Sequence, residues 1–597
     1  MYSIGCGKAD ITAFVKGAGM LGYGMYFHTM EGVETPLYSR AFVIADSEKK
    51  TKVAIVNAEL GFITIALKKG VLAELLKRKP DIGFTEENFM LTAQHTHSGP
   101  GGYSYYGLYN ISIPGFVKEV YEKLVSGITD SIIEAEHHLQ PGNISFGKSE
   151  FSLDKNVAFN RSMLQYNQNP EANPKLTKDT LNTGVDRNMY LLRFTDASGN
   201  DMGSINWFGV HTTSVSNDLN KVCSDNKGYA SDALEQQMPN KYIGAFAQGS
   251  CGDITPRFKY NPKRKYQRGK WDGISENDYE SAKYNGQLQA EKAAEIIENL
   301  KSNSNVLVDT AIDFGVKYVD FTQISCNPEF TGGNIEARTG SAAMGMSFFG
   351  GAYVDGPGAH PIVVKLAKIP INIIRLIELV RANFFNDKYK DAILTKYKTQ
   401  SVKDIVIEPN ARRMLGTKHI DRIVLPEWVE PSIALLKNYF IKEGYKRKPW
   451  TAKILPLQIF TLGDIALCAF PFEITTIAAK RLKQSLLERL SKKGIKEIIL
   501  VPYANSYSGY ITTYEEYQVQ MYEGGHTVFG EWSLAALQTK FDELAREMNV
   551  NKDCREIVHD NLPPDFTEEE LNQYPFFKAK WYERKEKQLK KKVLSKA

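Results

Sequence analysis

The chain has 597 residues, of which 43% are hydrophobic and 24% are charged, as is ordinary for a globular protein with a large core. Its formal net charge is +5, but residues 578–597 alone carry nine Lys or Arg and two Glu, so the remainder is close to neutral. This distribution excludes a generally basic nucleic-acid-binding protein. Six scattered cysteines without a CxxC pair argue against a disulfide-dense scaffold or a zinc ribbon.

The N-terminus carries no targeting signal that we recognise. Residues 1–7 do not combine a basic region with an apolar stretch, and no uncharged apolar run in the chain is long enough for a membrane span. We therefore expect no signal peptide and no transmembrane segment, which corresponds to a cytoplasmic location for the chain as written.

The first half of the chain alternates between strand and helix patterns. Residues 41–45 and 53–56 predict two paired strands around a polar turn. Apolar residues recur at helical spacing over residues 116–138, and residues 281–300 predict another helix. The sequence therefore predicts a mixed α/β fold.

Residues 361–385 have an unusual composition for a helix. They are rich in Ile, Leu and Val, while Lys365, Lys368, Asn372 and Arg375 recur at helical spacing. The pattern predicts an amphipathic helix with a wide apolar face, interrupted by Pro370. One interpretation is burial of that face against the core, and the other is contact with lipid or a lipid-like substrate.

The character of the sequence changes after residue 530. We expect one large catalytic domain over residues 1–530 and a short helical appendage with a Lys-rich tail over residues 531–597. A tail of this kind is usually solvated, and attraction to an anionic lipid surface is the second interpretation.

A pair of histidines follows an apolar strand-like run at residues 88–92. Residues 94–102 read QHTHSGPGG, and in an extended segment His95 and His97 point to the same side. Histidine is both the commonest metal ligand and the commonest acid–base group. The motif therefore indicates a metal or catalytic site, although a hydrogen-bonded turn is an alternative.

Other apolar runs also end in residues that suit such a site. His211 follows residues 205–210, Glu473 follows residues 465–470, and residues 498–501 lead to a segment that reaches Tyr510 and Tyr522. Each residue alone has a structural explanation, such as an acid at a helix start or a core aromatic. Together, two histidines and a carboxylate are a suitable ligand set for a catalytic zinc ion.

The sequence resembles the neutral (neutral/alkaline, non-lysosomal) ceramidase family, specifically its N-terminal catalytic domain. The similarity runs from residue 5 to about residue 530. It is carried by seven segments: GCGKADIT at 5–12, HTHSGPGG at 95–102, FNRS at 159–162, WFGVHTTS at 207–214, SDNKGY at 224–229, DGPG at 355–358 and YITTYEEY at 510–517. The family's glycine-aspartate-x-serine-proline motif falls on GDITP at 252–256.

The resemblance implies a role for each matching residue. The family's zinc ligands, for one ion per chain, fall on His95, His211, Glu473 and Tyr510. Its assisting groups fall on His97, Arg161 and Tyr522, and its substrate-site serine falls on Thr255.

The chain departs from the family pattern in several places. Thr255 replaces the serine, and Arg257 replaces an asparagine and begins a basic run over residues 257–270. The apolar helix at 361–385 replaces an aromatic and acidic stretch. We also expect the family's immunoglobulin-like C-terminal domain to be absent, along with the signal peptide usual in a largely secreted or surface-exposed family.

The activity that the resemblance implies is zinc-dependent hydrolysis of the ceramide amide to sphingosine and a fatty acid, by metal-activated water. The alternatives are an amidase acting on another N-acyl lipid or N-acyl amine, and a non-catalytic lipid-binding homologue. Metal content separates the last from the enzymes, and a substrate panel separates the first two. Residues 361–385 and the basic run suggest contact with a membrane or micelle surface; no nucleic acid is expected as a partner.

Overall fold

The structure is a computed structural model that describes residues 1–597 except 49, 111, 114, 240, 265–268, 304, 308–310, 385–388, 420–447, 551, 568–569 and 571–597. Four parts of the sequence predictions lie outside the described residues. They are the Lys-rich tail at 578–597, Phe385 at the end of the predicted apolar helix, and Lys265 and Arg268 of the basic run.

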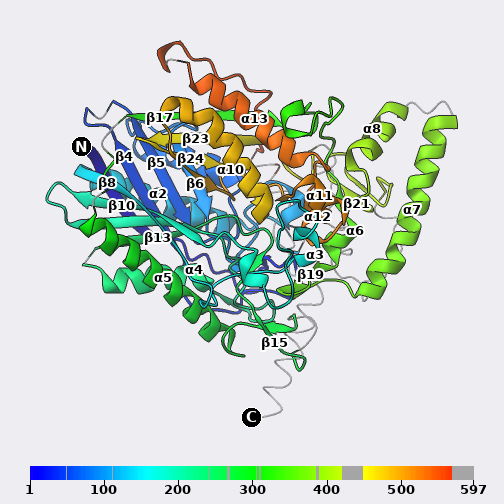
Figure 1. The fold of residues 1–597 in the computed structure, drawn as a ribbon, viewed down its shortest axis with the longest axis horizontal. Helices are drawn as coiled ribbons and strands as arrows, with labels where there is room; N and C mark the ends of the chain where they lie inside the picture. Colours follow the sequence, from blue (N-terminus) through cyan, green and yellow to red (C-terminus); the bar gives the residue numbers. More distant parts are fainter. Residues whose placement is uncertain are drawn as a thin grey trace.

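An eight-stranded mixed sheet forms the first half of the core (Figure 1). Its neighbours are antiparallel except for the parallel pairs β11–β13 and β5–β6. In spatial order the strands are β13 (Ile243–Gln248), β11 (Asp201–Phe208), β10 (Asn188–Asp196), β8 (Gln140–Glu150), β1 (Tyr2–Asp10), β4 (Tyr38–Ala45), β5 (Lys52–Ala58) and β6 (Phe89–Ala93).

A four-stranded sheet from the second half of the chain packs face to face on the first. Its strands in order are β17 (Ile312–Asp320), β23 (Ile454–Leu462), β24 (Ile465–Ala469) and β26 (Glu497–Val501). Phe42 and Ile55 of the first sheet share one buried cluster with Leu467 and Ile499 of the second. The inner faces of the two sheets therefore share a buried apolar interface.

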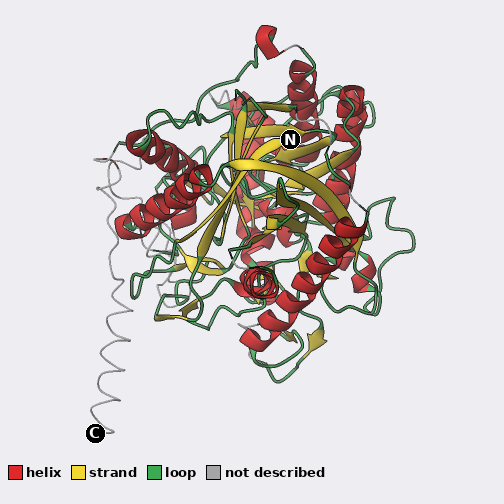
Figure 2. Ribbon diagram, turned by 90° about the vertical axis from the view of Figure 1, so that its left-hand side faces the viewer, coloured by secondary structure: helices red, strands yellow, loops and turns green. Residues whose placement is uncertain are grey.

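Helices cover the two outer faces of this sandwich, as Figure 2 shows around the central strands. The outer side of the first sheet packs on α1 (Ile65–Arg78), α2 (Lys118–His137), α4 (Asp225–Gln237) and α5 (Asp278–Ser302). The outer side of the second sheet packs on α10 (Thr476–Leu490) and α13 (Ser533–Met548). The result is a four-layer arrangement of helix, sheet, sheet and helix.

The two-residue alternation of side chains explains why several strands are apolar without interruption. In β4, Ala41 and Val43 face the helix layer, whereas Phe42 and Ile44 face the other sheet. A strand that is covered on both sides buries every side chain, so its sequence loses the polar alternation of a half-exposed strand.

The strand and helix predictions for the first half are confirmed. The two predicted strands are β4 and β5, which pair antiparallel. The predicted helix at 116–138 is α2, and the one at 281–300 is α5, which starts earlier because Asn277 caps its first turn through bonds from Tyr279 N and Glu280 N. The mixed α/β fold class is confirmed as well.

The predicted apolar helix is α7 (Pro361–Phe384), followed by α8 (Lys390–Gln400). It continues through Pro370 instead of ending there. Pro370 has no amide hydrogen to donate to the carbonyl of Leu366, and both residues are exposed. Only Ile371, Glu378 and Ala382 of α7 are buried, so most of the helix surface does not pack against the core.

The C-terminal appendage predicted from residue 531 is not separate from the core at its start. α13 buries most of its residues, including Leu537 and Phe541, in the cluster that covers the second sheet. Its apolar periodicity makes it one of the covering helices. No described helix combines the length and the apolar character that crossing a bilayer would require.

Candidate active site

Two strand ends of the first sheet bring three histidines together. β6 leads into His95 and His97, and β11 leads into His211. A parallel bridge between Thr96 and Thr212 joins the two segments side by side. The site therefore begins at the ends of two strands of one sheet, β6 at one edge and β11 next to the other edge, and strand ends are the usual place for reactive groups in α/β folds.

The second sheet contributes the acidic and phenolic groups. Glu473 begins β25 (Glu473–Ile474), directly after β24, and β25 pairs in parallel with β27 (Tyr510–Ile511). Glu473 and Tyr510 are partners in this register. The site is thus assembled from both halves of the chain.

The side chains converge closely. Oε2 of Glu473 lies 3.4 Å from Nε2 of His95 and 3.4 Å from Nε2 of His211. Nε2 of His97 lies 3.0 Å from Nε2 of His95. Among the described residues, the three imidazoles form a group whose ligand atoms all lie within 4.8 Å of one another. Imidazole nitrogens with a carboxylate are the donors that zinc takes in hydrolases.

Backbone carbonyls fix the tautomer of two of these histidines. Nδ1 of His95 lies 2.5 Å from Gly61 O, and Nδ1 of His211 lies 2.6 Å from Cys251 O and 2.9 Å from Ile254 O. A carbonyl only accepts, so Nδ1 carries the hydrogen and the Nε2 lone pair points into the site. Metal-binding histidines are typically held in this way, so both residues fit a divalent metal ion.

His97 is held differently. Its buried Nδ1 has no hydrogen-bond partner among the described residues, and its ring packs edge-on against Tyr23 at 4.7 Å between centroids. Burial lowers the pKa of His97 well below its ordinary value, so the imidazole is neutral at pH 7. With the Nε2 lone pair of His95 as acceptor, Nε2 of His97 carries the hydrogen, and Nδ1 of His97 has a lone pair that accepts no bond from the described residues.

Two tyrosines hold the carboxylate of Glu473. The Tyr503 hydroxyl donates to Oε2 at 3.0 Å, and the Tyr507 hydroxyl donates to Oε1. Burial by itself would raise the pKa of Glu473. The adjacent His95 and His211 lower it by more than burial raises it, so the pKa of Glu473 lies well below its usual range. Burial also lowers the pKa of His211 to about 4. An ionised carboxylate beside neutral imidazole is the protonation state that binds a metal.

The backbone at His95 is strained. Its φ is +76°, in the left-handed region that a residue with a Cβ rarely adopts. Two contacts hold it there: its N–H donates to Leu60 O at 2.9 Å, and the Thr212 hydroxyl donates to its carbonyl. Strain that the surrounding structure maintains is common at functional sites, and here it aims the imidazole at Glu473.

Arg161 is fixed by four partners beside the histidine group. It donates to Asp355 at 2.6 Å, to Glu523 at 3.2 Å, to Gly252 O at 2.9 Å and to the Tyr510 hydroxyl at 3.2 Å. Burial would lower the pKa of the guanidinium, but the neighbouring phenol and carboxylates raise it well above its ordinary value. Arg161 is therefore a permanent, preorganised positive charge in the site.

Asp355 joins Arg161 to two threonines, Thr213 after β11 and Thr255 in β14 (Ile254–Thr255). It accepts from the Thr255 hydroxyl at 2.5 Å and from the Thr213 hydroxyl at 2.9 Å. Burial would raise its pKa, but Arg161 lowers it below the usual range, so Asp355 is ionised. The hydroxyl hydrogen of Thr255 therefore points to a protein carboxylate.

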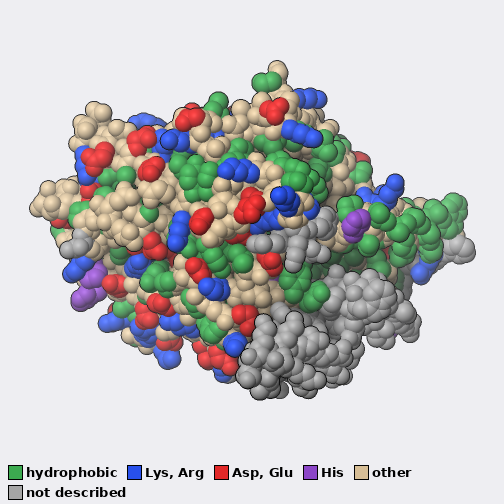
Figure 3. All heavy atoms as spheres, turned by 90° about the horizontal axis from the view of Figure 1, so that it is seen from below, with side chains coloured by type: hydrophobic (Ala, Val, Ile, Leu, Met, Phe, Trp, Pro, Cys, Tyr) green, Lys and Arg blue, Asp and Glu red, His purple; other side chains and the backbone are tan. Residues whose placement is uncertain are grey.

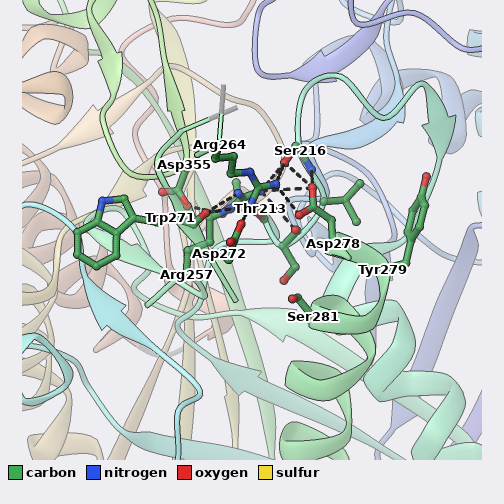
Figure 4. A network of polar contacts seen from close by, with 12 residues as sticks. Thr213, Ser216, Arg257, Arg264, Trp271, Asp272, Asp278, Tyr279, Ser281 and Asp355 are labelled. Carbon is green, nitrogen blue, oxygen red and sulfur yellow. Dashed lines mark hydrogen bonds and ion pairs between the residues drawn. The ribbon is translucent and has the colours of Figure 1, made fainter. Parts of the chain in front are cut away.

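Arg257 lies next to this network and hydrogen-bonds to backbone carbonyls around it (Figure 4). It is buried and donates to Thr213 O at 2.8 Å and to Trp271 O at 3.0 Å. Arg264 is also buried and pairs with Asp278 at 2.6 Å. The expectation that the basic run contacts a lipid surface is therefore wrong for these two residues, because their charges are used inside the protein.

Tyr522 lies at the outer side of the site and is only partly buried. Its ring stacks on Phe348 at 5.2 Å between centroids and meets the edge of Tyr510 at 5.7 Å. The Arg161 guanidinium lies 5.5 Å from the ring centroid. Tyr522 thus belongs to the same cluster, and its position next to Phe348 connects the cluster to the segment before α7.

The structure brings all eight sequence-predicted site residues into one cluster. Sequence reasoning missed four further members: Asp355, Glu523, Tyr503 and Tyr507. Asp355 lies in the DGPG segment and Glu523 directly follows Tyr522, so both were close to residues already considered. The two tyrosines follow the strand at 498–501 without a distinguishing pattern, because an aromatic side chain gives no local sign of the carboxylate that it will meet.

Comparison with known proteins identifies relatives of this arrangement. The family model for neutral/alkaline non-lysosomal ceramidase, N-terminal, matches residues 2–411 and 426–539. A neutral ceramidase of Pseudomonas aeruginosa is 33% identical over 546 residues, covering 91% of this chain and 72% of the relative. Neutral ceramidase B of Dictyostelium discoideum is 31% identical over 573 residues, covering 92% and 72%.

Solved structures share the fold as well. A structure described as ceramidase complexed with C2 superposes with a TM-score of 0.75 at 31% identity, covering 94% of this chain and 77% of the other. The neutral ceramidase of Pseudomonas aeruginosa gives 0.71 at 30% identity, covering 94% and 76%. Because the family match runs through both halves that build the site, and the fold is shared at the same time, this chain belongs to the neutral/alkaline non-lysosomal ceramidase family.

Proposed function

We propose that this protein is a zinc-dependent amidohydrolase that cleaves ceramide into sphingosine and a fatty acid. Family membership supports the reaction class, and the related solved structure is described as a ceramidase complexed with C2. The observation that carries the proposal for this chain is the convergence of Glu473 Oε2 on two imidazole nitrogens, each 3.4 Å away.

Four residues would hold the metal: His95, His211, Glu473 and Tyr510. The first two have the fixed tautomers of ligating histidines, and Glu473 is ionised and anchored. When bound, a zinc ion supplies a Lewis acid that polarises the amide carbonyl and makes water more acidic. Tyr510 is the partner of Glu473 in the β25–β27 register, which places both residues at the same end of their strands.

His97 would carry the proton. Hydrolysis of an amide needs a base for the attacking water and an acid for the departing amine, and one imidazole can serve both steps. His97 suits this role because it is neutral and its Nδ1 is not committed to a partner among the described residues. Water gives a proton to His97 as it attacks the carbonyl carbon, and the protonated imidazole then delivers the proton to the sphingosine nitrogen as the C–N bond breaks.

Arg161 and Tyr522 would stabilise the negative charge that develops on the amide oxygen. The guanidinium is already positioned by Asp355 and Glu523, so it does not need to reorganise during the reaction. Loss of one such donor typically costs about 10²–10³ in rate. Thr255 would act as a positioning residue, because its hydroxyl donates to Asp355 and so helps orient the carboxylate that holds Arg161.

The proposal is tested by fatty-acid release from ceramide in detergent micelles, by purified protein with and without a strong zinc chelator. Chelator-sensitive release that returns with added zinc is the expected result. A panel of other N-acyl lipids and N-acyl amines should be run in parallel, because Thr255 stands at the family's serine position. If the protein hydrolysed another member of the panel but not ceramide, that compound would be the substrate in place of ceramide.

Two outcomes would contradict parts of the proposal. A folded, zinc-loaded sample that releases nothing from any substrate would favour the non-catalytic lipid-binding alternative. A folded sample that hydrolyses ceramide but is insensitive to chelation, with no metal in the protein, would contradict the metal role of His95 and His211.

A further inference from the structure

The outward surface of α7 is a continuous apolar stripe. Large aliphatic residues follow one another at steps of four or three positions, so they line one side of the helix. Leu366 is 60% exposed and Leu376 is 63% exposed. The stripe consists of Ile362, Leu366, Ile369, Ile373, Leu376 and Val380, and Phe384 extends it at the far end.

This stripe is distinct from the side that attaches α7 to the protein. Ile371 and Ala382 are buried on the opposite side, and Glu378 accepts from Lys396 at 2.5 Å and Tyr397 at 2.7 Å on α8. The helix is therefore attached to the protein through this opposite side. Its outward side, about 36 Å long at 1.5 Å per residue, is not covered by the described residues. In Figure 1 α7 stands at the right-hand edge of the molecule, and in Figure 3 hydrophobic side chains gather at that end.

The charges on α7 are strongly biased. Its only acidic residue is Glu378, which is buried and paired, whereas Lys365, Lys368, Arg375 and Arg381 are basic. Lys365 and Arg381 are exposed beside the apolar stripe. A helix with an apolar face and basic flanks is the type that lies in the interface of a bilayer containing anionic lipid.

The segment before α7 links this helix to the candidate active site. α7 begins six residues after Asp355, which bonds Arg161 and Thr255. Before it, α6 (Met346–Phe349) places Phe348 against Tyr522 at the outer side of the site. Phe349 and Val364 pack on a shared apolar cluster, so the start of α7 and the Tyr522 side of the site are joined by one packed segment.

We propose that the α7 stripe is an interfacial docking surface that holds the protein on an anionic lipid bilayer, with the Tyr522 side of the site toward the membrane. A bilayer fits better than a protein groove because the helix is convex and projecting, and because its flanks are basic. The further consequence, that a long-chain substrate enters the site directly from the bilayer, rests on the proposed function. The docking itself does not.

The docking is tested by co-sedimentation of the full chain with vesicles of phosphatidylcholine and phosphatidylglycerol in equal parts. The test variant carries Leu366→Gln, Ile369→Gln and Ile373→Gln. The matched control carries Leu76→Gln, Leu153→Gln and Ile335→Gln, which are exposed aliphatic residues outside α7. We expect the test variant to bind at least about tenfold more weakly, since each lost side chain removes apolar area from the interface, and the control to bind like the parent.

Several results would overturn the docking surface. Equal binding by parent and test variant would do so, as would equal losses in test and control variants. A concentration-dependent dimer that the test substitutions disperse, without vesicle binding by the parent, would assign the stripe to self-association. Binding unaffected by high salt and by omission of phosphatidylglycerol would remove the anionic-lipid part of the proposal.

An activity comparison separates this proposal from the proposed function. The test variant should lose kcat/KM at least about tenfold on long-chain ceramide in vesicles and keep it on a short-chain, water-soluble analogue. Equal losses on both substrates would make α7 structural and overturn the delivery role. Vesicle binding that depends on the stripe, in a protein that hydrolyses neither substrate, would support the docking and reject only the amidase assignment.

Discussion

The histidines of the site differ in whether a backbone carbonyl fixes the hydrogen on one ring nitrogen. Nδ1 of His95 and of His211 faces carbonyl oxygens, which fixes Nε2 as the electron donor. His97 has no such bond among the described residues. One short sequence motif therefore contains two chemically different histidines, and the difference lies entirely in the atoms that surround their rings.

His97→Ala should separate proton transfer from metal binding. We expect turnover to fall about 10²–10⁴-fold, the usual contribution of a positioned acid–base group, with zinc still bound at one ion per chain. His95→Ala should lose zinc and activity together. Metal analysis of purified, folded variants alongside turnover is the measurement. If His97→Ala also lost the ion, His97 would be a ligand, and the three-imidazole group would be the metal site.

Asp355→Asn should affect both stability and turnover. The change removes the charge that pairs with Arg161 at 2.6 Å and weakens the acceptor for Thr255. Breaking a buried pair on one side costs about 3–5 kcal/mol of stability, and a displaced Arg161 should lower kcat more than it raises KM. Urea unfolding and steady-state kinetics measure the two effects.

Asp201→Asn is the matched control for that variant. Asp201 pairs with Arg193 at 2.6 Å in a similarly buried setting, and neither residue belongs to the site cluster. It should lose stability but keep turnover per folded molecule. If both variants lost turnover equally, Asp355 would have a purely structural role.

At the scale of elements, α4 is attached to the first sheet through a buried lysine. Nζ of Lys227 donates to Phe208 O at the end of β11 at 2.8 Å and to Gln289 of α5 at 3.3 Å. Burial lowers the pKa of Lys227 from 10.5 to about 7. The junction of α4, α5 and β11 thus depends on a lysine that loses its proton more readily than an exposed lysine does.

Lys227 should make stability depend on pH in a defined direction. Between about pH 7 and 10.5 the unfolded chain binds a proton that the folded protein does not, so the free energy of unfolding should rise with pH across that window. Lys227→Met keeps much of the side-chain volume and should flatten the rise. Urea titrations at both ends of the window test this, and parallel curves for the two proteins would mean that Lys227 keeps its proton in the fold.

At the scale of the whole molecule, the site joins the two sheets. His95 and His211 extend from strands of the first sheet, whereas Glu473 and Tyr510 follow strands of the second. A metal held by all four would cross-link the two halves of the sandwich. Binding to the folded state alone stabilises that state by mass action, by about 2.7 kcal/mol when free ligand exceeds Kd 100-fold.

Zinc should therefore raise the thermal stability of the whole protein. We expect a higher melting temperature with zinc than with chelator, as a single transition, because both sheets share one apolar interface. His95→Ala should melt at the same temperature in either buffer. Differential scanning calorimetry gives this readout without any activity assay. A zinc effect that survived in His95→Ala would point to binding elsewhere.

The family, the mixed fold and the main strands and helices could be predicted from the sequence because they depend on local signals. Apolar runs mark strands covered on both sides, helical periodicity marks α2 and α5, and the spacing of His95 and His97 marks a candidate site at a strand end. These signals arise from the geometry of one segment of backbone, so they persist whatever packs on that segment. The helical pattern that predicted α7 is also a local signal.

Only the tertiary structure decided how the segments meet. It showed that Glu473 lies 3.4 Å from two histidines, that Asp355 gathers Arg161 and Thr255, and that Arg257 is buried. It also showed that the apolar stripe of α7 faces outward. The side on which an amphipathic helix attaches and the partner of a buried charge depend on the register and packing of distant segments. Local patterns carry no information about either, because they are settled only when the whole sandwich closes.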